Sequence, residues 1–317
     1  MSTTFTLAHL SDLHLGPLPP FAARHWNAKR VLGYLNWQRG RRHVHSRAVA
    51  DLLASDVAQQ RVDHIAVTGD LVNIALPGEY EAALAWLQGL GDPDGISVVP
   101  GNHDIYTRLG CDPGVARWVD FMRGDGDAGA AWSMDGGAAF PYVRRRGGIA
   151  LVGLNSAIPT RPFVAAGRLG KPQLARLAEI LAQLGRDGLC RVVLIHHPPL
   201  PGQAPPLRAL ADARELERVL VEHGAELVLH GHNHRDMLVW QATSTGRCPV
   251  VGIASGSAAR PHGGEPLARY NLIEIAAGHG GKRISVRARG LSEIGGHVVD
   301  LGRIVADEPR HGTLTQP

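Results

Sequence analysis

The stretch ISVVPGNHD, residues 96–104, joins a run of apolar residues to an abrupt cluster of asparagine, histidine and aspartate. Such a run is typical of a buried strand, and the polar cluster falls where that strand ends. Four other stretches repeat this pattern: TFTLAHLSDLH (4–14), HIAVTGD (64–70), RVVLIHHP (191–198) and AELVLHGHNH (225–234). Parallel strands of one sheet end at a common edge, so we expect the five polar clusters to meet in space.

The sequence between these strands alternates between helical and extended patterns. Helices are expected near residues 45–60, 79–90, 172–184 and 208–222, and further strands near 140–145 and 149–154. Residues 236–290 have the pattern of short antiparallel strands joined by turns. The alternation predicts the α/β class. We expect one domain over residues 1–292, followed by a loosely ordered tail at 293–317.

The length and composition of the chain are typical of a globular protein with a sizeable hydrophobic core. The chain has 317 residues, and 44% of them are hydrophobic. A formal charge of +4, from 33 basic and 29 acidic residues, is only mildly basic. A polyanion backbone would need an extended basic patch, so no specific nucleic-acid binding is expected.

The cysteines and the N-terminal sequence point to the cytoplasm. Cys111, Cys190 and Cys248 are far apart and odd in number, which favours reduced thiols over a disulfide framework. The first residues, MSTTFTLAHL, lack the basic and long apolar regions of a secretory signal. No segment approaches the roughly 18–20 apolar residues of a membrane span.

The five clusters together offer oxygen and nitrogen donors but no thiolate. Any one of them could be an ordinary loop, but five such clusters at strand ends favour a metal site. The candidate ligands are Asp12, His14 and His234 for one ion, Asn102, His196 and His232 for a second, and Asp70 as the carboxylate between them. Imidazole, carboxylate and amide donors suit Fe, Mn, Zn or Co and argue against copper(I) or an iron–sulfur cluster.

A pair of ions roughly 3.5–4 Å apart can act as a clamp for displacement at phosphorus. Such a pair lowers the pKa of a bridging water, so that hydroxide exists near neutral pH, and it neutralises charge on the phosphoryl oxygens. The sequence therefore predicts phosphoryl-transfer chemistry that depends on two metal ions per chain.

The order of these motifs, D-x-H, G-D, G-N-H-D, H and G-H-x-H, resembles that of the calcineurin-like metallophosphoesterase superfamily. The resemblance spans roughly residues 5–240, and its motif set is highly specific. It implies a four-layer sandwich, in which two mixed β-sheets are flanked by α-helices and the dinuclear site lies at the strand ends. It also implies the ligand assignment given above.

The resemblance further implies two roles beside the metals. His103 would contact the substrate phosphate and protonate the leaving oxygen as a general acid. Asp104 would orient His103, as carboxylates often do for functional imidazoles.

Two departures narrow the resemblance. Ser/Thr protein phosphatases of this superfamily carry G-D-x-x-D-R-G and G-N-H-E, whereas residues 69–75 are GDLVNIA and the second motif ends in Asp104. Purple acid phosphatases place a tyrosine where this chain has Asn73. The chain is more similar to bacterial phosphodiesterases of the cyclic-nucleotide and glycerophosphodiester type, so a small phosphate diester attacked by a metal-bridging hydroxide is the expected reaction.

Residues 17–45, here called the 17–45 segment, follow the first metal motif and should overhang the site. The segment mixes basic and aromatic side chains: Arg24, His25, Trp26, Lys29, Arg30, Tyr34, Trp37, Arg39, Arg41 and Arg42. One interpretation is an amphipathic helix whose aromatic residues dock on the domain. The other is a cap that selects a substrate with an anionic or lipidic part and contacts a membrane surface.

Two alternative functions remain. The 17–45 segment could select a lipid-linked or nucleotide pyrophosphate for hydrolysis. The chain could also be a non-catalytic binding module that keeps the fold as a scaffold. Such a module would be expected to have lost ligands, and here none of the seven is missing.

Overall fold

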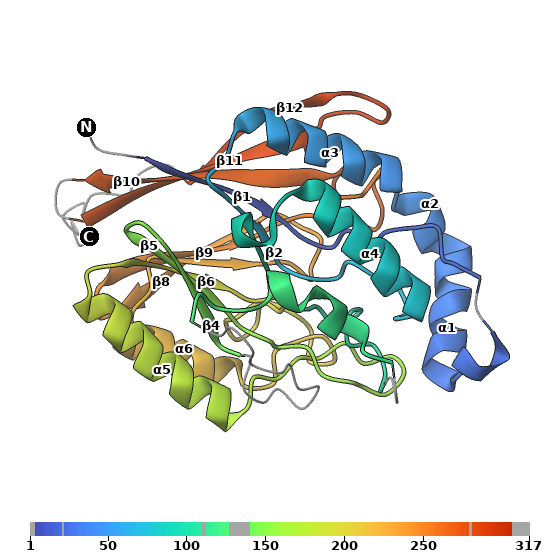
Figure 1. Ribbon diagram of the computed structural model, residues 1–317, viewed down its shortest axis with the longest axis horizontal. Coiled ribbons are helices and arrows are strands. Elements are labelled where there is room, and N and C mark those ends of the chain that lie inside the picture. Colours follow the sequence, from blue (N-terminus) through green and yellow to red (C-terminus); the bar gives the residue numbers. More distant parts are fainter. Residues whose placement is uncertain (1–3, 21, 109–111, 127–139, 279–280, 306–317) are drawn as a thin grey trace, which may run out of the picture.

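The computed structural model describes residues 4–20, 22–108, 112–126, 140–278 and 281–305. Two six-stranded β-sheets face each other, and helices cover their outer faces (Figure 1). Both sheets mix parallel and antiparallel pairs. The predicted α/β four-layer sandwich is therefore confirmed.

The first sheet joins the N-terminal strands to the C-terminal ones. Its strand order is β12 (Val298–Val305), β11 (Gly281–Leu291), β10 (Arg269–Gly278), β1 (Phe5–Leu10), β2 (His64–Val67) and β3 (Ile96–Val98). The last three run parallel, whereas β1–β10, β10–β11 and β11–β12 are antiparallel pairs. Three of the five polar clusters thus leave neighbouring parallel strands at one edge.

The second sheet carries the other two clusters. Its order is β4 (Tyr142–Arg146), β5 (Ile149–Gly153), β6 (Cys190–Leu194), β7 (Leu227–His230), β9 (Gly246–Gly252) and β8 (Met237–Thr243). The strands β5, β6, β7 and β9 are parallel. The antiparallel pairing expected over 236–290 is confirmed for β8–β9 and β10–β11, but β9 also pairs in parallel with β7.

The helices lie on the two outer faces. In Figure 1, α3 (Arg47–Gln60) and α4 (Pro77–Leu90) accompany the first sheet, and α5 (Lys171–Arg186) and α6 (Ala213–His223) accompany the second. Short 3₁₀ turns complete the connections: η1 (Ala23–His25), η3 (Pro93–Gly95) and η4 (Gly114–Phe121).

Alternation along the strands of the second sheet produces two cores. Leu151 and Val192 belong to the large core between the sheets. Their neighbours Ala150 and Val193 point the other way and pack in a second core with residues of α5 and α6, such as Leu177. Successive side chains of a strand face opposite sides of the sheet, so runs of apolar residues fill both layers.

The prediction of a loosely ordered C-terminal tail at residues 293–317 is wrong for part of that range. Val298–Val305 forms the edge strand β12, which pairs with β11. Residues 306–317 lie outside the described part of the chain. The extent of the domain, set at residues 1–292 from the sequence, stays a prediction.

The 17–45 segment is largely helical. It contains α1 (Ala28–Asn36), a π-helical turn η2 (Trp37–Arg41) and α2 (Arg42–Val44), which lie at one end of the molecule in Figure 1. The Asn27 side chain accepts the Arg30 N–H and so caps α1. Across the described residues, we find no helix whose length and hydropathy would let it traverse a bilayer.

Candidate metal centre

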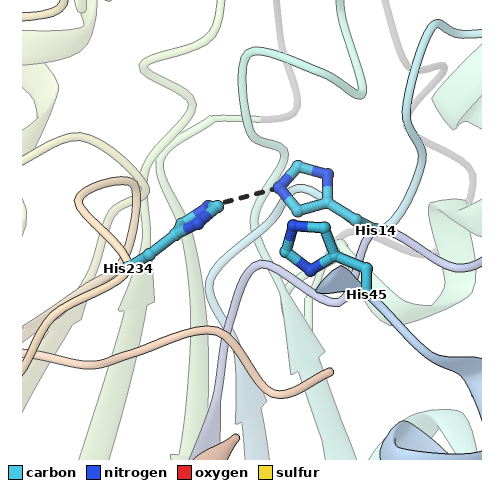
Figure 2. A group of neighbouring side chains, drawn as sticks. All are labelled: His14, His45 and His234. Atoms are coloured by element: carbon cyan, nitrogen blue, oxygen red, sulfur yellow. Dashed lines mark hydrogen bonds between the residues drawn. The ribbon is translucent and has the colours of Figure 1, made fainter. Parts of the chain in front are cut away.

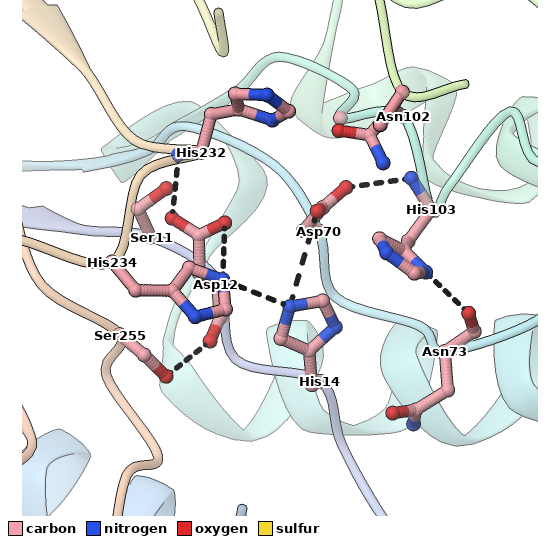
Figure 3. A network of polar contacts seen from close by, with 12 residues as sticks. Ser11, Asp12, His14, Asp70, Asn73, Asn102, His103, His232, His234 and Ser255 are labelled. Atoms are coloured by element: carbon pink, nitrogen blue, oxygen red, sulfur yellow. Dashed lines mark hydrogen bonds and ion pairs between the residues drawn. The ribbon is translucent and has the colours of Figure 1, made fainter. Parts of the chain in front are cut away.

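The loops that follow five strands bring the predicted ligands together (Figure 3). Two ligands follow β1, one follows β2 and one follows β3 in the first sheet, while β6 and β7 of the second sheet supply the rest. All seven side chains are buried: Asp12, His14, Asp70, Asn102, His196, His232 and His234. The convergence expected from the sequence is therefore present in the structure.

One half of the site joins the first and last motifs. The Nε2 atoms of His14 and His234 are 3.3 Å apart, and His234 Nε2 lies 3.2 Å from Oδ1 of Asp12. The other oxygen of Asp12 accepts the backbone N–H of His232 at 2.9 Å. This hydrogen bond ties the loop after β7 to the loop after β1, across the two sheets.

The other half of the site centres on His196. Its Nε2 atom lies 3.2 Å from Oδ1 of Asn102 and 3.2 Å from Nδ1 of His232. The three residues that the sequence predicts for the second ion therefore lie close together.

Asp70 lies between the two halves. Its Oδ2 atom is 3.9 Å from His14 Nε2 on one side and 3.5 Å from His196 Nε2 on the other. One carboxylate oxygen therefore lies within 4 Å of an imidazole from each half.

Hydrogen bonds behind two of the imidazoles decide which ring nitrogen faces the site. Nδ1 of His14 lies 3.1 Å from the carbonyl oxygen of Val72, and Nδ1 of His196 lies 2.7 Å from that of Thr68. A carbonyl can only accept, so each Nδ1 donates a proton and each Nε2 turns a lone pair toward the site.

The remaining two imidazoles are held in the same manner. Nε2 of His232 donates to the carbonyl oxygen of Arg208 at 2.9 Å, and Nδ1 of His234 donates to Glu265 at 2.9 Å. Nε2 of His196 and Nδ1 of His232, which are 3.2 Å apart, then present lone pairs to one another. This arrangement is repulsive unless a cation lies among the nitrogens, so the donor set fits metal ions.

The electrostatics of the site point the same way. Burial lowers the pKa of three imidazoles, which keeps them neutral: His14, His196 and His232. Burial, and after it the charge of Asp12, raises the pKa of Asp70 to about 8. Burial opposes protonation of His234, but Asp12 and Glu265 outweigh it and raise the pKa of that imidazole to about 9. The negative charge of the buried Asp12 carboxylate thus favours protonation of Asp70 and of His234, and metal cations would balance the same charge.

The backbone at the site is held in a conformation that the sequence does not reveal. Five of the candidate ligands adopt the left-handed region: Asp12 (φ 54°), His14 (φ 40°), Asp70 (φ 55°), His232 (φ 72°) and His234 (φ 51°). Residues other than glycine rarely adopt this region, and such strain gathers at functional sites.

Two glycines of the motifs are needed for close packing. A Cβ atom at Gly101 would collide with the Asp70 carboxylate, and one at Gly231 would collide with the side chains of Ser11 and Asp12. The glycines that precede Asn102 and His232 therefore let the two loops approach the carboxylates.

His103 lies beside the ligands, but Asp104 does not orient it. The His103 ring is edge-on to that of His14, with centroids 4.9 Å apart, and its Nδ1 is hydrogen-bonded to the carbonyl oxygen of Asn73. The carboxylate of Asp104 instead accepts backbone N–H groups of the neighbouring loops: Gly101, Asp70, Leu71 and Val72. The role predicted for Asp104 is wrong, because its side chain stabilises the loops rather than the imidazole.

His45 is a residue of the site that the sequence analysis missed. Its ring centroid lies 4.7 Å from that of His14 and 5.6 Å from that of His234, and the three imidazoles could together hold an ion (Figure 2). Its Nδ1 lies 2.9 Å from Oγ of Ser257. The spacing His43–Val44–His45 repeats the H-x-H pattern of residues 232–234 and was the available signal.

Four of the candidate ligands line a cavity of about 730 Å³: Asp70, Asn102, His232 and His234. The 17–45 segment forms one wall, with Lys29, Trp37 and Arg41 among the residues that line it. Arg208 and Phe163 line the cavity from other loops. The expectation that this segment overhangs the site is therefore confirmed, and the volume is in the range of small-molecule sites.

Comparison with solved structures finds the same fold in two phosphatases. A dimetal phosphatase from Danio rerio superposes with a TM-score of 0.59 over 94% of this chain and 98% of that chain, at 15% identity. Purple acid phosphatase from yellow lupin superposes with a TM-score of 0.52 over 95% of this chain and 53% of that chain, at 13% identity. At these identities the likeness concerns the fold.

Sequence comparison identifies the family. A protein of Synechococcus sp. named "probable cyclic nucleotide phosphodiesterase" is 26% identical over 272 residues, which cover 83% of this chain and 87% of the relative. A glycerophosphodiester phosphodiesterase of Enterobacter lignolyticus is 28% identical over 244 residues, which cover 72% of this chain and 70% of the relative. The family model for calcineurin-like phosphoesterases matches residues 5–236. The resemblance found in the sequence is thus confirmed, and the chain belongs to the calcineurin-like phosphoesterases.

Proposed function

We propose that this phosphoesterase holds two metal ions and hydrolyses small organic phosphate diesters. The ligands of one ion are Asp12, His14 and His234, those of the other are Asn102, His196 and His232, and Asp70 is shared. The observation that carries the proposal is the position of Asp70 Oδ2 between imidazoles of both halves, at 3.9 and 3.5 Å.

The chemistry divides between the ions and the chain. Bound ions of the Fe, Mn, Zn or Co type would lower the pKa of water and neutralise charge on the phosphoryl oxygens. His103 protonates the leaving oxygen in this scheme. Its Nδ1 is engaged by the Asn73 carbonyl, and Nη1 of Arg41 lies 2.8 Å from its Nε2, so Nε2 is the nitrogen that would transfer a proton once Arg41 turns to the substrate phosphate.

The substrate class rests on the relatives and on the cavity. One relative is named a probable cyclic nucleotide phosphodiesterase and the other a glycerophosphodiester phosphodiesterase, and the substrates in both names are small diesters. The cavity of about 730 Å³ has room for a molecule of that size beside the ligands. We also propose a cytoplasmic location, which the free, buried thiols of Cys190 and Cys248 favour.

Hydrolysis of bis(p-nitrophenyl) phosphate tests the proposal. Protein loaded in turn with Mn, Fe, Co or Zn should release p-nitrophenol, and EDTA should stop the reaction. The Asp70→Asn variant keeps the shape of the side chain and serves as the inactive control. No EDTA-sensitive hydrolysis with any of the four metals would contradict the proposal.

A second candidate is the hydrolysis of a lipid-linked pyrophosphate at a membrane surface. One observation favours it: the 17–45 segment exposes Trp26, Val31, Leu32 and Leu35, each at least 36% accessible, and two of them, Leu32 and Leu35, line the cavity. Apolar residues next to basic ones suit an anionic lipid surface. Wild-type protein should then sediment with anionic vesicles, and a Leu32→Ser, Leu35→Ser double variant should not. Equal sedimentation of the two proteins would exclude this candidate.

A further inference from the structure

We propose that the substrate carries a second phosphate group besides the one that is hydrolysed, and that Lys29, with Arg41 beside it on the same cavity wall, binds this group. The inference rests on the proposed function, since it assumes a phosphate ester at the metal ligands. It concerns the part of the cavity formed by the 17–45 segment.

Lys29 is a buried cation that the fold alone does not explain. The residue is only 8% exposed, its Nζ donates to Oγ1 of Thr160 at 2.7 Å, and it lies 4.3 Å from the ring centroid of Tyr106. Over the described ranges it forms no ion pair with a carboxylate. Burial lowers its pKa to about 8, a cost that an anionic ligand would offset.

The position of Lys29 places a bound anion near the reacting group. The ring of Tyr106 is stacked on that of His103, with centroids 5.3 Å apart and planes 17° from parallel. One aromatic side chain therefore links Lys29 to the proposed general acid. An anion at Lys29 would belong to the same small molecule as a phosphate at the metal ligands.

Arg41 adds a second cation to this wall. Its Nη1 lies 2.8 Å from Nε2 of His103, and the described part of the chain gives it no acidic partner. A guanidinium has five N–H donors, whereas a neutral imidazole accepts only one hydrogen bond. The remaining donors of Arg41 are available to phosphate oxygens, for which the planar guanidinium is suited.

Arg30, a third basic residue of this segment, has a structural role. Its guanidinium donates to the backbone carbonyl oxygens of His25, Ile74 and Ala75. These bonds clamp α1 to the loop that follows β2 and use the donors of the side chain. Lys29 and Arg41 instead line the cavity. Arg30 therefore holds the segment in place, whereas Lys29 and Arg41 are positioned to contact a bound molecule.

The charge balance of the cavity supports a second phosphate rather than a single diester. The acidic residues that line the cavity are Asp70 and Glu265. The first lies between the metal ligands, and the second is hydrogen-bonded to His234. The basic residues of the lining are Lys29, Arg39, Arg41 and Arg208. A diester carries one negative charge and a phosphate monoester nearly two at pH 7, so this surplus of cations matches an additional monoester group.

A matched pair of nucleotides tests the inference by binding alone. Thymidine 5′-phosphate and thymidine 3′,5′-bisphosphate differ only in the second phosphate, and titration calorimetry measures the dissociation constant of each with metal-loaded protein. Wild-type protein should bind the bisphosphate about tenfold more tightly, the effect of one charge-assisted hydrogen bond. The Lys29→Gln variant should lose this preference, and Lys29→Arg, which keeps the charge, should retain most of it.

Lys171→Gln is the matched control, because Lys171 begins α5 and is exposed. It should bind both nucleotides as the wild type does. Equal affinity of the wild-type protein for the two nucleotides, or an undiminished preference in Lys29→Gln, would overturn the inference. These measurements need no turnover. A preference for the bisphosphate that Lys29→Gln abolishes, without hydrolysis of any diester, would therefore contradict the proposed function and leave only the phosphate-binding role of Lys29 standing.

Discussion

The side chain of Asp104 accepts the backbone N–H of Asp70 at 2.7 Å, and the side chain of Asp70 accepts the backbone N–H of His103 at 2.7 Å. Each of the loops after β2 and β3 thus supplies a carboxylate that accepts a backbone N–H of the other loop. This reciprocal arrangement fixes Asp70, the carboxylate proposed to be shared, and His103, the proposed general acid, relative to one another.

Asp104 should therefore be essential for stability. Asp104→Asn replaces one acceptor oxygen by an amide group that faces backbone N–H donors, and at least one buried N–H is left without a partner. We expect a loss of about 3 kcal/mol in the free energy of unfolding, measured by urea denaturation. Asp94→Asn, at an exposed position, should change it by less than about 0.5 kcal/mol. An Asp104→Asn protein as stable as the wild type would refute the assigned role.

Loss of the shared carboxylate should empty the metal site. Asp70→Asn keeps the volume of the side chain but removes its negative charge, which both proposed ions require. Elemental analysis after metal loading should find about two ions per wild-type chain and fewer than one per variant chain. Two ions retained by the variant would mean that Asp70 does not bridge them.

Replacement of His103 should separate metal binding from catalysis. His103→Gln should retain both ions, because the imidazole is not among the proposed ligands. Its turnover of bis(p-nitrophenyl) phosphate should fall roughly 10²–10⁴-fold, the usual contribution of a general acid. Unchanged turnover at full metal content would remove His103 from the reaction.

The ion pair between Asp56 and Arg289 should make stability depend on pH. Burial alone would raise the pKa of Asp56, but hydrogen bonds from Arg289 and Tyr270 outweigh it and hold the pKa below its usual value. The stabilisation is therefore present above the unfolded-state pKa of about 3.9 and is lost as the pH falls through the folded-state value.

Asp56→Asn tests this dependence. The variant should unfold at lower urea concentration than the wild type at pH 7, and the difference should shrink as the pH falls below about 4. Asp300→Asn, in an exposed pair with Arg287, is the control and should have little effect at either pH. A difference between Asp56→Asn and wild type that is the same at pH 3 and pH 7 would contradict the role of this ion pair.

The sequence predicted the convergence of the ligands because it depends on regular structure. Apolar runs identify the strands, and parallel strands bring their ends to one edge, so Asp12 and His232 could be placed together from 220 residues apart. The fold class followed from the same alternation of strands and helices.

The missed features depend on irregular structure. His45 follows a short helix rather than a strand, and the pattern of strand ends does not include it. The side chain of Asp104 reaches loops whose backbone is left-handed at Asp70, a geometry that sequence periodicity does not encode. Strand β12 is an edge strand with two register shifts and mostly exposed or partly exposed residues, so its apolar alternation is weak.

The central claim is that two cations share Asp70. Anomalous diffraction from crystals of the Mn-loaded protein, recorded on both sides of the metal absorption edge, tests it most directly. We predict two anomalous peaks roughly 3.5–4 Å apart with the Asp70 carboxylate between them. A single peak, or two peaks on one side of Asp70, would contradict the account.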